Sequence, residues 1–140
     1  MFAAGDQKLA VLFREVKTIA VVGAKDAPSQ PVDRVGRYLI AAGYEVIPVH
    51  PKRKDVWGLP TYSRLADVPV PIDLVNLFRA AQYCPEHALE VLALPVRPRA
   101  FWMQLGIRSP QARELLEPAG ILVIEDSCSM VEHRRLLGEK

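Results

Sequence analysis

Hydrophobic residues along the chain form two alternating patterns: short unbroken runs, and sets spaced three and four residues apart. Short apolar runs are typical of strands buried on both faces of a sheet, and the wider spacing is typical of amphipathic helices. The runs predict strands at residues 19–22, 45–49, 72–78, 100–103 and 121–124. The spacing predicts helices at residues 6–16, 33–42, 85–94, 110–117 and 131–137, with a brief helical turn at 65–68.

The alternation of strands and helices predicts an α/β fold, a doubly wound parallel sheet with right-handed crossovers and helices on both faces. A short edge strand is expected around residues 59–62, where Gly58 and Pro60 limit regular structure. Neither an internal repeat nor a linker divides the sequence, so we expect a single domain over residues 1–140.

Composition narrows the classes of function. The net charge of +2 and the lack of a basic stripe argue against nucleic-acid binding. Apolar runs are too short to cross a bilayer and no signal peptide is visible, so we expect a cytoplasmic protein without a membrane partner. The two cysteines are expected to be reduced thiols. Twelve prolines, twelve arginines and one asparagine hint at a thermophilic source.

The loop after the first predicted strand is a candidate phosphate site. An apolar run ends at Gly23, a polar loop follows, and a helical pattern begins near Asp33. Backbone N–H groups and a helix N-terminus would face a phosphate there. One glycine stands where a dinucleotide motif needs three, so Lys25, Ser29 and Arg34 would supply the donors instead. An ordinary connection that binds nothing is an equal alternative.

The end of the second predicted strand is basic. The segment His50-Pro51-Lys52-Arg53-Lys54 has no carboxylate until Asp55. Folds that bind NAD place an acidic residue here to hold the ribose 2′-hydroxyl. Cations suit a phosphorylated ribose, as in NADP or coenzyme A, and they disfavour NAD. The alternative is a solvated basic turn.

Other reactive residues favour structural roles. The histidines and cysteines lack the spacing of a zinc site. Cys128 follows a buried strand and is expected to be a packed thiol. His133 is expected to make a structural hydrogen bond, Asp26 to be a solvated turn residue, and Gln104 to face the crevice. We therefore expect neither a metal site nor a catalytic residue.

A set of short segments spread over nearly the whole chain carries a family likeness: residues 19–24, 28–29, 34–38, 43–49, 58–63, 73–75, 78–79, 102–106, 126–128 and 132–134. In these segments the chain resembles the stand-alone CoA-binding domain proteins, which are similar to the N-terminal domain of the succinyl-CoA synthetase alpha subunit. The family commonly has Asn before the proline that ends the second strand, and this chain has His50.

The resemblance implies a Rossmann-like sheet with the third strand beside the first. It implies non-catalytic binding of coenzyme A or acyl-CoA, with the pyrophosphate on the first loop and the adenosine towards the second strand's end. The implied ligand-binding residues are Gly23, Ala24, Lys25, Pro28, Ser29, Arg34, His50, Pro51, Lys52, Arg53, Phe78, Arg79 and Gln104. One alternative is an NADP-linked oxidoreductase or redox sensor. Another is a regulatory or scaffold subunit for a protein partner of the acyl-CoA ligase type.

Overall fold

The computed structural model describes residues 4–138. Within them lies a five-stranded, wholly parallel sheet in the order β2-β1-β3-β4-β5. The strands are β1 (Thr18–Val22), β2 (Glu45–Val49), β3 (Leu74–Leu77), β4 (Ala100–Met103) and β5 (Leu122–Ile124). The helices are α1 (Ala4–Glu15), α2 (Pro31–Ala41), α3 (Cys84–Leu92), α4 (Pro110–Leu116) and α5 (Ser129–Leu137). The predicted doubly wound α/β fold is confirmed.

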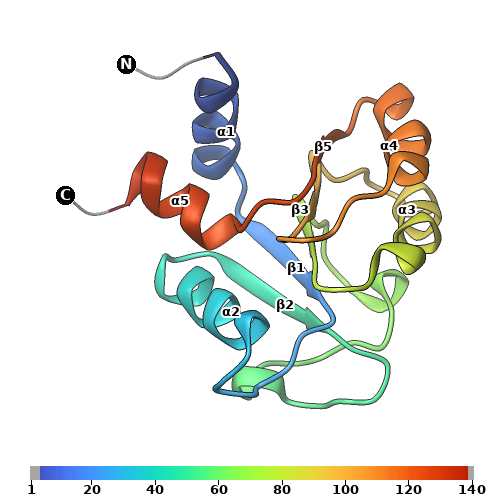
Figure 1. Cartoon of the computed structure of the whole chain (residues 1–140). Coiled ribbons are helices and arrows are strands. Elements are labelled where there is room, and N and C mark those ends of the chain that lie inside the picture. The colour runs from blue at the N-terminus through green and yellow to red at the C-terminus, as the bar shows by residue number, and fades with distance from the viewer. Residues whose placement is uncertain (1–3, 139–140) are drawn as a thin grey trace.

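Helices cover both faces of the sheet, as Figure 1 shows. Side chains of α1, α2 and α5 form one buried cluster with alternate strand residues such as Ile19 and Val21. Side chains of α3 and α4 form a second cluster with the intervening residues Ala20 and Val22. This separation follows from strand geometry, because successive side chains point to opposite faces. It explains why the strands read as unbroken apolar runs.

The predicted edge strand around residues 59–62 is reduced to one parallel bridge between Tyr62 and Val49. Asp55, Trp57 and Gly58 all have left-handed backbone angles in the connection that leads to it. A 3₁₀ turn at Val56–Gly58 occupies part of the same connection. Such a backbone cannot run alongside β2, so the chain touches the sheet at a single residue.

Some boundaries also differ from the predicted ones. The third strand begins at Leu74, because the preceding Asp73 turns its carboxylate to the backbone N–H groups of Lys17 and Thr18, at 2.8 and 3.1 Å. Helix α5 begins at Ser129, two residues before the predicted start. Among the described helices, none is long and apolar enough to span a membrane.

The strand order reverses between β1 and β3. β1 pairs with β2 on one side and with β3 on the other, so the loops after β1 and β3 leave the sheet edge in different directions. Gly23, at the end of β1, has φ of +86°, and a Cβ there would lie 2.5 Å from the carbonyl oxygen of Phe78. Only glycine allows this approach, which brings the two loops together at the switch point.

Candidate functional site

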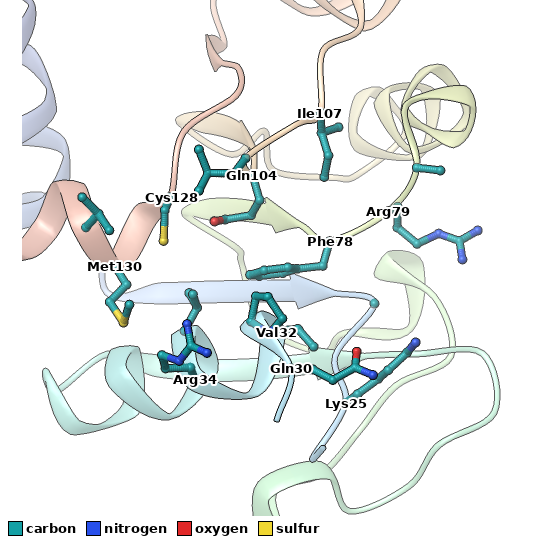
Figure 2. A pocket seen from close by; sticks show the side chains of 16 residues that line it. Lys25, Gln30, Val32, Arg34, Phe78, Arg79, Gln104, Ile107, Cys128 and Met130 are labelled. Carbon is teal, nitrogen blue, oxygen red and sulfur yellow. The ribbon is translucent and has the colours of Figure 1, made fainter. Parts of the chain in front are cut away.

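A pocket of about 510 Å³ opens at the switch point (Figure 2). Its walls come from the loop after β1, the first turn of α2, the ends of β3 and β4, and the start of α5. Phe78 and Val32 lie at its centre, with Ile107 and Met130 towards its edges. A volume of this size and a mainly apolar lining are typical of small-molecule sites.

Cationic side chains stand around this apolar centre. Figure 2 shows Lys25 and Gln30 at one end of the pocket and Arg34 near Met130 at the other. Arg79 also lines the pocket, but its guanidinium points away from the centre. A ligand with an uncharged body and separate anionic groups would match this distribution.

Gln104 is buried at the inner side of the pocket and is held by a polar network. Its Nε2 donates to Ser129 Oγ at 2.8 Å and also to Asn76 Oδ1, and Asn76 Nδ2 donates to Ser129 Oγ at 3.0 Å. Buried amides bonded in this way have one orientation. The sequence signal for Asn76 was its place as a polar residue inside an apolar strand.

His50 shapes the basic turn after β2. Its Nδ1 accepts the backbone N–H groups of Lys52 at 3.0 Å and Arg53 at 3.1 Å. A side-chain acceptor bonded to the backbone two and three residues on closes a turn in the way Asn does. The histidine that departs from the family pattern therefore makes the local contact expected of an asparagine.

The environment of His50 is strongly positive. Burial lowers the pKa of its imidazole, and so do the charges of Arg53, Lys25, Arg79 and Lys52, in that order. These cations come from the loops after β1, β2 and β3, which converge at one edge of the sheet. A convergence of positive charge from three loops produces a local potential that attracts anions.

One of these cations already has a protein partner. Arg53 Nη1 lies 3.2 Å from Asp26 Oδ1, and both side chains are about two-fifths exposed. Asp26, expected to be a solvated turn residue, instead joins the loops after β1 and β2. The pair is exposed, so its strength is modest and an incoming phosphate could compete for the guanidinium.

Of the predicted residues, six line the large pocket: Gly23, Lys25, Arg34, Phe78, Arg79 and Gln104. Ala24 is fully buried beneath the loop, and Pro28 and Ser29 are exposed and lie outside the pocket lining. His50, Lys52 and Arg53 form the neighbouring turn, and Pro51 lines a second hollow beside it.

Comparison with known proteins shows the family of this chain. Residues 17–134 match the family model described as the CoA binding domain. The chain belongs to this family.

Two relatives span almost the same length. Uncharacterized protein YneT of Bacillus subtilis (strain 168) is 36% identical over 122 residues, which cover 87% of this chain and 89% of that protein. The structure of cell-free ID.343 from Thermus thermophilus is 42% identical with a TM-score of 0.89, covering 94% of this chain and 98% of that one.

A larger enzyme contains the same fold. Acetyl-coenzyme A synthetase 1 of Ca. Korarchaeum cryptofilum, solved with phosphate and ADP, matches with a TM-score of 0.67 at 22% identity. The match covers 80% of this chain but 26% of the synthetase chain. At this identity the likeness concerns the fold alone. The same fold thus occurs as part of a larger synthetase chain and as nearly the whole of smaller chains.

The pocket lining also includes a residue that was not predicted to belong to the site. Cys128 packs against the buried cluster formed with α1, α2 and α5, as expected, and it also lines the pocket, where it is partly exposed. It immediately precedes α5. His133 makes the expected structural hydrogen bond, with Nδ1 at 2.7 Å from the Tyr38 hydroxyl. Within residues 4–138, no group of three or more His, Cys, Asp or Glu side chains could hold a metal ion.

Proposed function

We propose that this protein binds coenzyme A or an acyl-CoA, and binds it without chemical conversion. The observation that carries the proposal is the cluster of Lys25, Lys52, Arg53 and Arg79 around His50, beside an apolar pocket in a chain of the CoA binding domain family. Coenzyme A joins a pyrophosphate and a ribose 3′-phosphate to a long uncharged arm. Its chemistry therefore matches both the charged and the apolar parts of the site.

Each part of the ligand has a suitable surface. The pyrophosphate would lie on the loop after β1, beside Lys25. The ribose 3′-phosphate would lie near Lys52 and Arg53 at the end of β2. The uncharged arm would follow the pocket past Phe78 towards Cys128 and Met130.

The same features disfavour other nucleotides. Residues 50–54, after β2, include no carboxylate to hold the 2′-hydroxyl of NAD. The nearby Asp26, on the loop after β1, pairs with Arg53 instead. NADP has a phosphorylated ribose but carries a second, polar nucleoside where the pocket is apolar. Coenzyme A satisfies both ends of the site.

Calorimetric titration tests the proposal. Coenzyme A should bind more tightly than dephospho-CoA, NAD or NADP, and recovered coenzyme A and acetyl-CoA should be chemically unchanged. Lys52→Ala should reduce the preference for coenzyme A over dephospho-CoA. Arg97→Ala is the matched control, because Arg97 is a cation on the turn before β4, at the opposite edge of the sheet. Equal binding of NAD and coenzyme A would overturn the proposal.

A further inference from the structure

The two ends of the large pocket differ in chemistry. Lys25 lines one end and belongs to the cations around His50. Figure 2 shows Cys128 and Met130 at the other end, which we call the distal end. The side chains that define the distal end are Leu105, Cys128, Met130 and Val131. None of these four side chains carries a charge, so the distal end suits an uncharged part of a ligand.

Two side chains of the distal end are apolar and yet exposed. Leu105 is 67% exposed, the largest fraction among the large apolar side chains of residues 4–138, and Val131 is 48% exposed. Leu105 comes from the loop after β4 and Val131 from α5, and a hydrogen bond of 2.8 Å between Gln104 and Ser129 joins these two elements. Both side chains line the same cavity. Exposed apolar side chains that gather at a pocket are typical of a binding surface.

Gln104, the polar side chain beside the distal end, is already satisfied within the protein. Its Nε2 donates to Asn76 Oδ1 and to Ser129 Oγ, so both amide hydrogens are in use. A polar group entering here would lose its hydrogen bonds to water without gaining one from this amide. The inner wall therefore disfavours a polar ligand group.

Arg34 is the charged side chain near the distal end (Figure 2). It is exposed, so an ion pair with a carboxylate would strengthen binding by less than about fivefold. Each methylene moved from water onto an apolar surface strengthens binding by up to about fourfold. A chain of several methylenes thus gains more at the distal end than a single carboxylate does.

We infer that the distal end binds the alkyl chain of an acyl thioester, so that the protein prefers coenzyme A carrying an apolar acyl group to free coenzyme A. The uncharged arm of coenzyme A ends at its thiol. With the pyrophosphate beside Lys25 and the arm passing Phe78, the group on the sulfur enters the distal end. The inference rests on the proposed function, because it needs coenzyme A bound in this direction.

Calorimetry on the wild-type protein tests the inference with coenzyme A, acetyl-CoA, butyryl-CoA and hexanoyl-CoA. Affinity should rise by about two- to fourfold for each methylene from acetyl-CoA to hexanoyl-CoA. Adipoyl-CoA has the chain of hexanoyl-CoA with a carboxylate in place of the terminal methyl group. It should bind more weakly than hexanoyl-CoA, because the carboxylate must leave water for an apolar surface.

Variants at the two exposed side chains show where the alkyl chain lies. Leu105→Ser and Val131→Ser each remove apolar surface from the distal end, and together they should reduce the preference for hexanoyl-CoA over acetyl-CoA by about tenfold. Leu89→Ser is the matched control, because Leu89 is 56% exposed on α3, outside the pocket lining, and should leave the preference unchanged. The wild-type series decides even if a variant does not fold.

Equal wild-type affinity for coenzyme A and the three alkanoyl thioesters would overturn the inference and leave the proposed function intact. Tighter binding of adipoyl-CoA than of hexanoyl-CoA would also overturn it, because Arg34 and not the apolar surface would then select the acyl group. Failure of coenzyme A and of every thioester to bind would remove the proposed function and the inference with it.

Discussion

The indole Nε1 of Trp57 donates to the buried carboxylate of Asp33 at 2.9 Å. Asp33 lies in the first turn of α2 and also accepts from Arg37, at 3.0 Å. Trp57 has φ of +55°, which is rare for a bulky residue. This strained residue fastens the connection after β2 to α2, and so holds the basic turn beside the loop after β1.

Gly36→Ala should break this fastening. A Cβ at Gly36 would lie 2.1 Å from the Trp57 ring, so the indole must move away and lose its bond to Asp33. Overpacking of this kind costs about 1–3 kcal/mol in the free energy of unfolding. Urea denaturation monitored by tryptophan fluorescence would measure both the loss of stability and the movement of Trp57.

Gly5→Ala provides the matched control for that change. Gly5 is also helical, in α1, and a Cβ there would meet nothing within 4 Å. The Gly5→Ala variant should gain about 0.5–1 kcal/mol in the free energy of unfolding, from helix propensity alone. Equal stabilisation by both substitutions would show that Trp57 does not depend on Gly36.

Stability should fall as the solution becomes acidic, in part through His133. Its ring packs edge-on against Phe13, Tyr38 and Tyr44, and burial lowers the pKa of the imidazole. The unfolded chain therefore takes up a proton at a higher pH than the native protein does. The free energy of unfolding should decrease as pH falls below about 6.5, the ordinary histidine pKa, until the native ring also protonates.

Urea denaturation at about pH 7.5 and about pH 5.5 would check this pH dependence. His133→Gln should be less stable at both values, because it loses the ring contacts, but its stability should change less between them. The pKa of His50 is also lowered, so the stability of His133→Gln should still depend on pH, but less than that of the wild type. An unchanged difference between the two pH values in the variant would contradict the role assigned to His133.

The two cysteines should differ sharply in reactivity. Cys84 is fully buried, and burial raises the pKa of its thiol, so little reactive thiolate is present. Cys128 is partly exposed at the pocket wall. A chromogenic disulfide reagent should label one thiol quickly in the native protein, and coenzyme A should slow that labelling. Rapid labelling that persists in Cys128→Ser would contradict this assignment.

The strands and helices could be predicted from the sequence because each is marked by a pattern within its own residues. Each buried strand needs an apolar run, and residues 45–49 and 100–103 match β2 and β4 at both ends. The edge strand failed because its geometry depends on a distant contact, the packing of Trp57 against α2. No pattern within residues 55–62 records that contact.

The site likewise has a part that local sequence predicts and a part that depends on distant contacts. Cations after β1, β2 and β3 could be expected to meet, because the carboxyl ends of parallel strands share one edge. The wall formed by Cys128 and Met130 could not be expected, since it depends on how α5 packs across the sheet.

The two cations at opposite ends of the pocket give the last prediction. From sequence, Arg34 is the stronger candidate for the pyrophosphate, because its planar fork lies near a helix N-terminus. In the structure, Lys25 is among the cations that lower the pKa of His50, whereas Arg34 is drawn at the far end near Met130 (Figure 2). If the phosphates lie near His50, Lys25 contributes more to binding than Arg34 does.

Lys25→Ala should therefore weaken coenzyme A binding by about ten- to a hundredfold, the range for losing one charge-assisted hydrogen bond. Arg34→Ala should weaken it by less than about threefold. The affinity of the wild-type protein for coenzyme A should decrease as the salt concentration rises from about 50 to about 300 mM. The decrease should be smaller in Lys25→Ala, because that variant has lost one of the contacts that salt screens. Calorimetry on both variants, with Arg97→Ala as the control for net charge, measures these differences. A larger loss in Arg34→Ala would place the pyrophosphate at the α2 end of the pocket and would separate it from the cluster around His50.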